Sequence, residues 1–472
     1  MLKASILDTY PKADASLVHE LLSREVRKSP CKIIALDDDP TGVQTVHDIS
    51  VYTDWSEDSI RQGFSEKEKL FFILTNSRSF TKEQTREVHG EIGENLETVA
   101  DGRPYLLISR SDSTLRGHYP LETEVLRETI ERYHAWNFDG EILCPFFAEG
   151  GRYTVGDIHY VKYGDDLIPA AETEFARDKT FGYHCSSLPD YVEEKSRGNY
   201  RAEEVISISL EDIRAMNFEK IENQLTEARG FRKIVVNAID NTDVEIFAVA
   251  LYRAISRGRH FLFRTAAAFV KAVADISDRP LLTRDEMITE QSGRGGVIII
   301  GSHTEKTTRQ LEDLRKIEEI RFLEMNSDLV LEGQALAEEA ARIVGEIEKF
   351  IQLGETVAVY TRRTLLTVEN DSKEEALLRS VKISQAVQSV VGNLKVKPAF
   401  VLAKGGITSS DIGVKALKVK KARVLGQIQP GIPVWKTDSK SKFPDIPYVI
   451  FPGNVGKDDS LYQAAAVLLG KS

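Results

Sequence analysis

The sequence is poor in the residues that mark secreted, zinc-binding or membrane-spanning proteins. It has only three cysteines, Cys31, Cys144 and Cys185, and their odd number and wide spacing fit neither a disulfide framework nor a zinc site. No apolar run approaches the ~18 residues that a membrane helix requires, and the first residues lack the apolar stretch of a signal peptide. We therefore expect a reduced, cytoplasmic compartment.

The sequence also has fewer basic than acidic residues. Lys and Arg total 62 against 73 Asp and Glu, which gives a net charge of −11. Such a surface repels nucleic acid and anionic membranes, so neither is expected as a partner. A small anionic substrate remains compatible with this charge, because binding it needs only local cations.

Short apolar runs alternate with longer amphipathic segments, which is the pattern of α/β folds with parallel strands. Strands are predicted at residues 33–36, 50–52, 70–74, 105–108, 141–144, 233–237, 260–264, 297–300, 356–360, 399–402, 424–428 and 448–451. Helices are predicted at residues 15–28, 82–99, 121–133, 210–228, 305–317, 336–351 and 372–391. The stretch 150–200 has no sustained period and is predicted to form loops that act as a lid or substrate wall.

A chain of 472 residues is too long for one core, and a charged, irregular stretch near its middle predicts a domain boundary. The expected division is a domain over residues 1–275, a linker over 276–296 and a second domain over 297–472. The predicted fold class is α/β, with two domains that are each a largely parallel sheet flanked by helices. The active site is expected in the cleft between the domains.

Three consecutive carboxylates, Asp37, Asp38 and Asp39, follow the first predicted strand. Ligands bind beyond the carboxyl ends of strands in open α/β sheets. Adjacent carboxylates repel unless a cation, a hydroxylated ligand or free backbone N–H groups compensate. One Asp alone would more often be a helix N-cap, but three in a row favour a functional site.

A second polar cluster, Ser77, Arg78 and Ser79, follows the strand predicted at 70–74. Arginine and hydroxyl groups in this arrangement could hold a carboxylate through charge-assisted hydrogen bonds. A polar loop in which Ser79 or Thr81 caps the next helix is an equally good interpretation.

The strand predicted at 105–108 opens into the densest polar cluster. Its members are Arg110, Ser111, Asp112, Ser113, Thr114, Arg116 and Gly117. Three strand ends of this kind would line one edge of a single parallel sheet. A polyhydroxylated anion fits such a site, with arginines for its carboxylate and aspartates and serines for its hydroxyl groups.

The second half repeats a different pattern, in which a strand is followed by a glycine turn and a helix. The turns begin at Gly301-Ser302, at Lys404-Gly405-Gly406 and at Gly453. Glycine allows the backbone to approach a ligand closely, and free N–H groups at a helix start bind anions. Each turn alone could be plain helix punctuation, but three in one domain favour a nucleotide site.

Familiar motifs of other enzyme classes are missing from the sequence. No G-x-G-x-x-G follows a strand with an acidic residue about 20 positions later, which disfavours a dinucleotide dehydrogenase. Neither G-x-S-x-G nor H-E-x-x-H occurs.

Taken together, the motifs resemble those of the four-carbon acid sugar kinase family, which joins a sugar-binding N-terminal domain to a nucleotide-binding C-terminal domain. The resemblance spans residues 32–463 and rests on short stretches at residues 38–42, 77–79, 112–117, 405–408, 430–433 and 453–456. It implies an ATP-dependent kinase, with Mg²⁺, that phosphorylates the terminal hydroxyl group of threonate, erythronate or 3-oxotetronate. A homodimer is the candidate assembly.

The resemblance and the strand-end clusters together assign the site residues. We expect Asp38 or Asp39 to accept the proton of the attacking hydroxyl group, while the other positions the substrate or a metal ion. The predicted substrate-binding residues are Asp38, Ser77, Arg78, Arg110, Ser111, Asp112, Ser113 and Arg116. The predicted nucleotide-binding residues are Ser302, Lys404, Gly405, Gly406, Ile407, Thr408, Gly453 and Asn454. Metal ligands are not predicted.

The sequence also departs from the family pattern. Many members read Leu-Lys-x-Gly-Asn before the last glycine turn, where this chain has Ile450-Phe451-Pro452-Gly453-Asn454. The absent lysine supports an alternative, a non-catalytic sensor of a sugar acid or nucleotide. A second and weaker alternative is an NAD-dependent hydroxy acid dehydrogenase.

Overall fold

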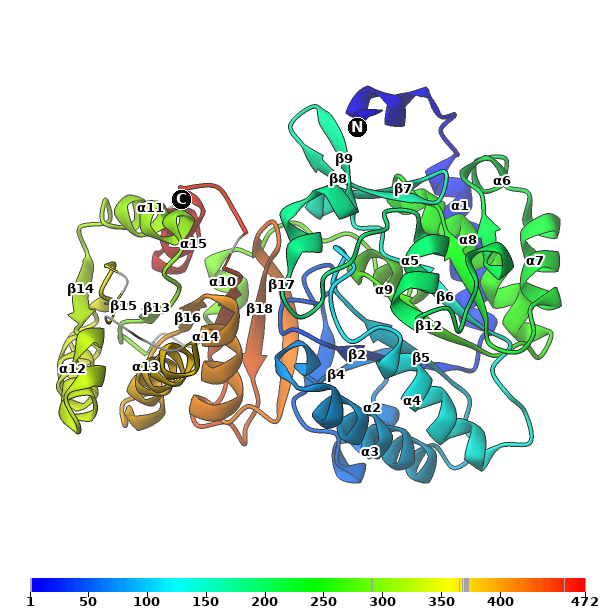
Figure 1. Ribbon diagram of the computed structural model, residues 1–472. Coiled ribbons are helices and arrows are strands. Elements are labelled where there is room, and N and C mark those ends of the chain that lie inside the picture. Colours follow the sequence, from blue (N-terminus) through cyan, green and yellow to red (C-terminus); the bar gives the residue numbers. More distant parts are fainter. Residues whose placement is uncertain are drawn as a thin grey trace. The chain divides into compact units, whose positions relative to one another are not determined.

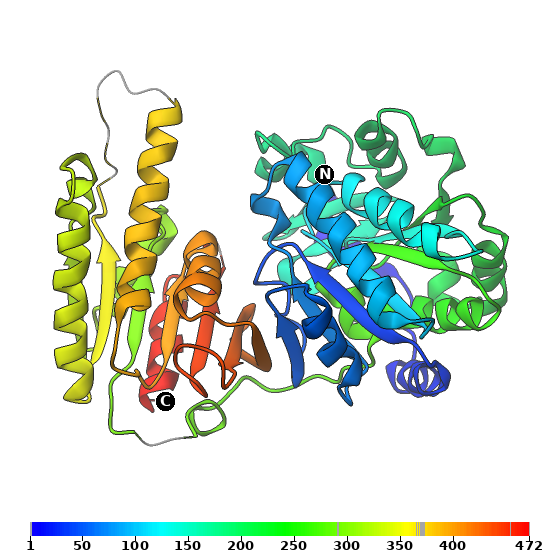
Figure 2. The same ribbon diagram turned by 90° about the horizontal axis from the view of Figure 1, so that it is seen from below.

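The computed structural model describes residues 2–289, 292–364, 366, 368, 373–453 and 455–471. The chain divides into two compact units (Figures 1 and 2): unit 1 comprises Met1–Thr45 and Asp54–Asp278, and unit 2 comprises Val46–Thr53 and Arg279–Ser472. The segment Val46–Thr53 therefore differs from the predicted division, which placed it in the first domain. The reason is a non-local pairing, because β3 (Ile49–Tyr52) runs antiparallel to β17 (Lys421–Gln429).

Unit 1 is built on a sheet in which each pair of neighbouring strands is parallel. In spatial order its strands are β10 (Ile206–Ile208), β11 (Arg232–Val236), β6 (Gly140–Cys144), β12 (Phe261–Thr265), β5 (Tyr105–Arg110), β2 (Lys32–Asp37) and β4 (Leu70–Leu74). Parallel strands covered on both faces read as continuous apolar runs, and β4 is an example, because all five of its residues are buried. The strands predicted in this half are confirmed, except that β10 is too short to be recognised from the sequence.

Helices flank the sheet of unit 1 on both faces. One group consists of α2 (Glu57–Ser65), α3 (Lys82–Ala100) and α4 (Leu121–Ile130), and the other consists of α1 (Ala15–Lys28), α6 (Leu210–Arg214), α7 (Phe218–Glu227), α8 (Asn241–Ser256) and α9 (Ala267–Val273). Figure 1 shows α2, α3 and α4 on one side of the sheet and α1 and α8 on the other. The predicted helix over 210–228 is wrong as a single element, because the backbone of Met216 has a positive φ of 50° and separates α6 from α7.

The segment 150–200 contains regular structure, so its prediction as loops is wrong. It supplies β7 (Arg152–Val155), β8 (Ile158–Tyr163), β9 (Asp166–Pro169) and α5 (Leu188–Ser196), and the strands form a small antiparallel sheet with β1 (Leu2–Lys3). The hairpins turn at Gly156 and Gly164, both with positive φ. Such short strands with mixed polarity leave no readable period in the sequence.

Unit 2 combines an antiparallel part with a parallel part. Its strands in spatial order are β3, β17, β18 (Ile432–Thr437), β19 (Pro447–Phe451), β16 (Val401–Lys404), β13 (Val297–Ile300), β15 (Thr356–Thr361) and β14 (Ile320–Met325). The pairs from β3 to β19 are antiparallel, and those from β19 to β14 are parallel. The predicted strand at 399–402 is found two residues later as β16.

The helices of unit 2 follow the predicted pattern. They are α10 (Arg284–Met287), α11 (Glu305–Leu314), α12 (Ala335–Gln352), α13 (Lys373–Asn393), α14 (Gly406–Asp411) and α15 (Ser460–Leu469). The strands β14 and β18 were not predicted, and Pro433 within β18 hides that strand because proline is rare inside strands. The described helices include none that is both long and apolar enough to cross a membrane. Two α/β units with largely parallel sheets confirm the predicted fold class.

Candidate active site

The polar clusters predicted in the first half meet at one edge of the unit 1 sheet. Strand β2 lies between β4 and β5, and Asp37 at its end is in register with Leu74 of β4 and Arg110 of β5. Because these strands are parallel, the residues that follow them emerge at the same edge. The structure therefore brings Asp38, Arg78 and Arg110 into direct contact.

Asp38 is buried and bound by two guanidinium groups. Arg78 donates from Nε to Asp38 Oδ2 (3.1 Å) and from Nη2 to Asp38 Oδ1 (2.6 Å). Arg110 donates from Nη1 to Asp37 Oδ1 (2.8 Å) and to Asp38 Oδ1 (3.3 Å). A fork of this kind is among the strongest charge-assisted interactions, so Asp38 is fixed in one orientation.

Asp39 lies at the more open side of this cluster. Its side chain is 22% exposed, and its Oδ2 lies 3.4 Å from Arg78 Nη1. Its Oδ1 accepts hydrogen bonds from the Thr41 backbone N–H (2.9 Å) and hydroxyl group (2.6 Å). These bonds stabilise a turn, and no helix begins at residues 37–39, so the helix-cap interpretation does not hold here.

The turn brings the backbone of Gly42 against Asp37. A Cβ atom at Gly42 would lie 2.2 Å from each carboxylate oxygen of Asp37, so only glycine allows this close approach. Burial, only partly offset by Arg110, raises the pKa of Asp37 to about 7. Burial would also raise the pKa of Asp39, but Arg78 and Thr41 outweigh it and hold the pKa below its usual value.

The loop after β5 forms a second charged group beside the first. Arg116 donates from Nε to Asp112 Oδ2 (2.7 Å), and the Thr114 hydroxyl group donates to the same oxygen. Burial would raise the pKa of Asp112, but Arg78 and Arg116 outweigh it and hold the pKa well below its usual range. Asp112 is therefore ionised and lies within the field of both arginines.

The segment 150–200 holds this loop in place. His159 of β8 makes a hydrogen bond through Nε2 to the Ser113 carbonyl oxygen (2.8 Å). The Tyr183 and Tyr191 hydroxyl groups donate to the carbonyl oxygens of residues 114 and 115, each at 2.8 Å. These bonds stabilise a backbone that is left-handed at Leu115, with φ of 67°.

Arg152, the first residue of β7, is a candidate site residue that sequence reasoning missed. Its guanidinium lies over the Phe175 ring at 5.3 Å, and that of Arg116 lies over the same ring at 5.1 Å. Its buried Nε has no hydrogen-bond partner among the described residues. Burial lowers the pKa of Arg152, and the nearby Asp112 opposes this effect. The segment that carries Arg152 was interpreted as loops, which concealed its position.

Two serines of the predicted set, Ser77 and Ser111, face the protein, whereas Ser113 is half-buried. Ser77 is fully buried and donates to Glu122 Oε1 (2.7 Å), and the Ser111 hydroxyl group lies 3.5 Å from the Thr265 carbonyl oxygen. Glu122 also accepts from Arg264, which ends the predicted strand at 260–264. Arg264 and Glu122 were not predicted, although an arginine at a strand end was a usable signal.

Charges in this group nearly cancel. The carboxyl groups are those of Asp37, Asp38, Asp39, Asp112 and Asp178, and the guanidinium groups are those of Arg78, Arg110, Arg116 and Arg152. Since the pKa of Asp37 is about 7, this residue is partly protonated at neutral pH, which brings the carboxylate charge close to the guanidinium charge. The arrangement is suited to bind an anion with hydroxyl groups.

In unit 2 the three predicted glycine turns lie together, because β16 is flanked by β13 and β19. A Cβ atom at Gly301 would lie 2.2 Å from Thr408 Oγ1, and one at Gly405 would lie 3.3 Å from Ser302 Cβ. Gly405 has φ of 121°, a conformation that side chains disfavour. A Cβ atom at Gly453 would lie 4.0 Å from the Gly406 nitrogen.

Two basic side chains flank these turns. Lys404 is buried and donates to the Pro452 (2.7 Å) and Gly453 (3.1 Å) carbonyl oxygens, and burial lowers its pKa to about 7. Arg363, which was not predicted, donates from Nη1 to the Ser302 carbonyl oxygen (2.6 Å). Lys404 lies on β16 in register with Phe451 of the neighbouring strand β19. From this position it supports the third turn.

Other predicted residues are less constrained. Ile407 is 72% exposed, and Asn454 lies outside the described residues. In the part of the chain that the structure describes, no group of three or more His, Cys, Asp or Glu side chains is arranged to hold a metal ion.

Comparisons with known proteins agree with a cluster of aspartates and arginines in unit 1 and glycine turns in unit 2. The family model of a sugar-binding N-terminal domain matches residues 33–273, and that of a nucleotide-binding C-terminal domain matches residues 297–461. The chain belongs to the family that joins these two domains, the architecture of the four-carbon acid sugar kinases.

Individual relatives are distant. The chain is 24% identical over 279 residues to the D-erythronate kinase of Heliobacterium modesticaldum, a match that covers 58% of this chain and 57% of that protein. The match thus spans little more than half the length of this curated relative.

Solved structures show the same fold. A Haemophilus influenzae protein has a TM-score of 0.62 at 18% identity, with 92% of this chain and 100% of that chain covered. A Salmonella typhimurium LT2 protein described as a tRNA synthase has a TM-score of 0.63 at 14% identity, with 92% and 98% covered. At these identities the likeness concerns the fold alone.

Proposed function

We propose that this chain is a kinase that transfers the terminal phosphoryl group of ATP to a hydroxyl group of a four-carbon sugar acid of the erythronate, threonate or 3-oxotetronate type. The observation that carries the proposal is the buried cluster of Asp38, Arg78 and Arg110 at the carboxyl ends of β2, β4 and β5. Membership in the family and the D-erythronate kinase relative support the same reaction class.

The sugar acid binds to unit 1 with its carboxylate at Arg116 and Arg152. Arg78 and Arg110, which the sequence assigned to the substrate, are already engaged by Asp37 and Asp38. Arg152 is the better carboxylate ligand, because its Nε has no partner among the described residues. A carboxylate there would gain charge-assisted hydrogen bonds from Arg152, and at Arg116 it would share the guanidinium group with Asp112.

Asp39 is the residue that accepts the proton of the attacking hydroxyl group. It is ionised at neutral pH and more exposed than Asp38. The substrate oxygen forms a bond to the terminal phosphorus of ATP while the bond between that phosphorus and its bridging oxygen breaks, and ADP leaves. Such transfers depend mainly on positioning and on neutralised charge, and Asp38 with its two arginines holds Asp39 in place.

ATP binds to unit 2 at the turns that begin at Gly301, Gly405 and Gly453. Their close packing supports a backbone cradle for phosphates, and Arg363 supplies positive charge next to Ser302. Lys404 orients the third turn through its carbonyl oxygens. Mg²⁺ would be held mostly by the phosphates and water, as is usual for this ion.

A coupled assay for ADP formation tests the proposal directly. The full chain is incubated with ATP, Mg²⁺ and one of erythronate, threonate, 3-oxotetronate or other short aldonates, with erythritol as the neutral control. We expect ADP formation that depends on one of the acids and not on erythritol.

Two results would redirect the assignment. Saturable binding of an acid and of ATP without ADP formation would favour the sensor, the alternative that the missing lysine at Phe451 suggests. Stabilisation by NAD and not by ATP in a thermal-shift comparison would favour the dehydrogenase, because a ligand at about 100 times its Kd stabilises by roughly 2.7 kcal/mol.

A further inference from the structure

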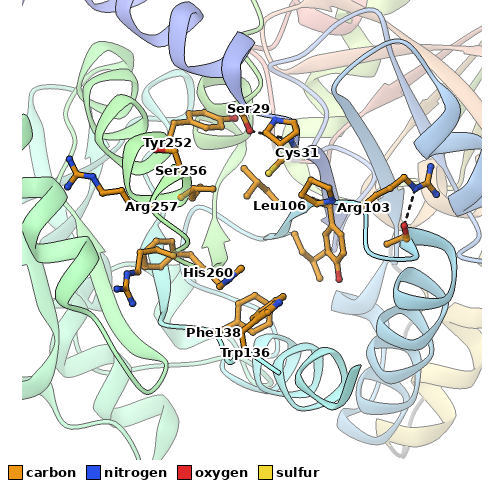
Figure 3. A pocket seen from close by; sticks show the side chains of 18 of the residues that line it. Ser29, Cys31, Arg103, Leu106, Trp136, Phe138, Tyr252, Ser256, Arg257 and His260 are labelled. Atoms are coloured by element: carbon orange, nitrogen blue, oxygen red, sulfur yellow. Dashed lines mark hydrogen bonds between the residues drawn. The ribbon is translucent and has the colours of Figure 1, made fainter. Parts of the chain in front are cut away.

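Unit 1 contains a cavity of about 840 Å³ at the amino ends of its central strands (Figure 3). Cys31 precedes β2, Tyr105 begins β5 and Phe261 begins β12, and all three line the cavity. The opposite ends of β2 and β5 carry Asp37 and Arg110 of the candidate active site. The cavity is therefore a separate site at the other edge of the same sheet.

The middle of the cavity is apolar. Figure 3 shows Cys31, Leu106, Phe138 and Tyr252 around a common space, while the guanidinium groups of Arg103 and Arg257 point away from it. A volume of about 840 Å³ falls within the range of sites that enclose small organic molecules, roughly 300–1,000 Å³.

The charged residues of the wall are already paired within the protein. Arg103 donates to the Val99 and Ala100 carbonyl oxygens at the end of α3, at 2.6 and 3.0 Å. Arg257 donates to Glu222 at 2.6 Å. The charge of Arg257 is thus paired with a carboxylate, and the hydrogen bonds of Arg103 hold its guanidinium group at the end of α3, so an ionic ligand would have to displace existing contacts.

The other wall charges are engaged in the same way. Arg259 donates to Asp139 at 3.1 Å, and Lys28 donates to Glu25 at 2.9 Å. Glu97 accepts from the Tyr105 hydroxyl group.

Two imidazole rings line the wall, and that of His134 already lies with Nε2 2.9 Å from Glu97 Oε2. His260 stacks on Trp136 with ring centroids 3.8 Å apart and an interplanar angle of 6°. Its ring nitrogens make no hydrogen bond to the described residues. Both rings line the cavity, and a ligand group could donate to or accept from the imidazole.

We propose that this cavity binds a neutral, mostly apolar small molecule of aromatic size that carries one hydrogen-bonding group. The volume, the apolar middle and the paired charges of the wall define this ligand class. The site is independent of the proposed kinase reaction, and its test needs no enzymatic activity.

The test uses N-phenyl-1-naphthylamine, a neutral fluorescent probe with a single N–H group, titrated into the full chain. Its anionic counterpart, 1-anilinonaphthalene-8-sulfonate, is titrated in parallel. We expect one saturable site for the neutral probe and at least tenfold weaker binding of the sulfonate. The variant Cys31→Phe, which places a ring in the cavity, should weaken the neutral probe at least tenfold, while Cys185→Phe, distant in the fold from the cavity, should change it less than twofold.

Absence of saturable binding, or equal binding by Cys31→Phe and the unchanged protein, would overturn the proposal. A sulfonate that binds as tightly as the neutral probe would overturn the assigned ligand class. If circular dichroism shows that Cys31→Phe does not fold, the site is tested instead by the rate at which N-ethylmaleimide labels the cysteines of the unchanged protein. The probe should slow labelling of Cys31 in the unchanged protein and leave Cys185 unaffected, and equal labelling of Cys31 with and without probe would refute the site.

Discussion

Replacing Asp37 by asparagine removes a carboxyl group from the buried end of β2 and keeps its size and shape. The folded protein raises the pKa of Asp37 from 3.8 to about 7, chiefly through burial. Each pKa unit corresponds to about 1.36 kcal/mol. The folded state therefore binds a proton more tightly than the unfolded chain by about 4 kcal/mol.

The sign of the pH dependence follows from that difference. Between pH 4 and 7 the unfolded chain has lost the proton while the folded protein keeps it, so stability falls as the pH rises through this range. From pH 5 to pH 8 the expected loss is about 3 kcal/mol in unit 1. The amide group that the variant carries at this position cannot ionise, and Arg110 retains Asp38 at 3.3 Å as a partner.

Hydrogen exchange of the β2 amides measures this loss locally, without interference from unit 2. The free energy of opening should favour Asp37→Asn over the unchanged protein by about 3 kcal/mol more at pH 8 than at pH 5. Asp101→Asn is a matched control, because Asp101 is exposed at the end of α3, and it should show no such change. If Asp37→Asn and the unchanged protein have parallel pH profiles, Asp37 is ionised throughout, and its protonation near neutral pH is refuted.

The remaining predictions concern catalysis and ligand binding. Asp39→Asn should lower kcat by roughly 10²–10⁴ in the coupled assay, and turnover within threefold of the unchanged protein would exclude Asp39 as the base. Arg152→Met should raise the KM for the sugar acid at least tenfold and leave the KM for ATP unchanged, whereas the exposed Arg201→Met should alter neither; a similar rise in both KM values would contradict a role in carboxylate binding. Gly405→Ala forces a side chain into a backbone with φ of 121°, at a cost of about 1–3 kcal/mol. It should weaken ATP binding in calorimetry and spare sugar-acid binding, and unchanged ATP affinity would remove this turn from the nucleotide site.

The placement of the first site could be predicted from the sequence because it depends on local signals. Polar residues after apolar strands mark the carboxyl edge of a parallel sheet, and that rule correctly brought Asp38, Arg78 and Arg110 together. The same rule would have found Arg264, which lies near the end of β12, and Arg363, which follows β15. The rule could not predict which arginine is left to bind a ligand, because that depends on the ion pairs between side chains of different strands.

Non-local pairing limited the rest of the prediction. β3 belongs with unit 2 only because it pairs with β17, far along the sequence, and no local pattern encodes that partner. The hairpins of 150–200 were missed for a related reason, since their strands are short and the segment is held by contacts with the distant loop at 112–117. Arg152 was hidden with them.

The proton on Asp37 and the Nε of Arg152, which has no hydrogen-bond partner among the described residues, bear on the same question, which is why an acid rather than a neutral sugar would be the substrate. With Asp37 protonated, the ionised carboxylates of the cluster no longer outnumber its guanidinium groups. A substrate carboxylate would then form an ion pair with the half-buried Arg152, which a neutral polyol would not. Selectivity for an acid would then arise from the ionisation of a residue that does not itself touch the substrate.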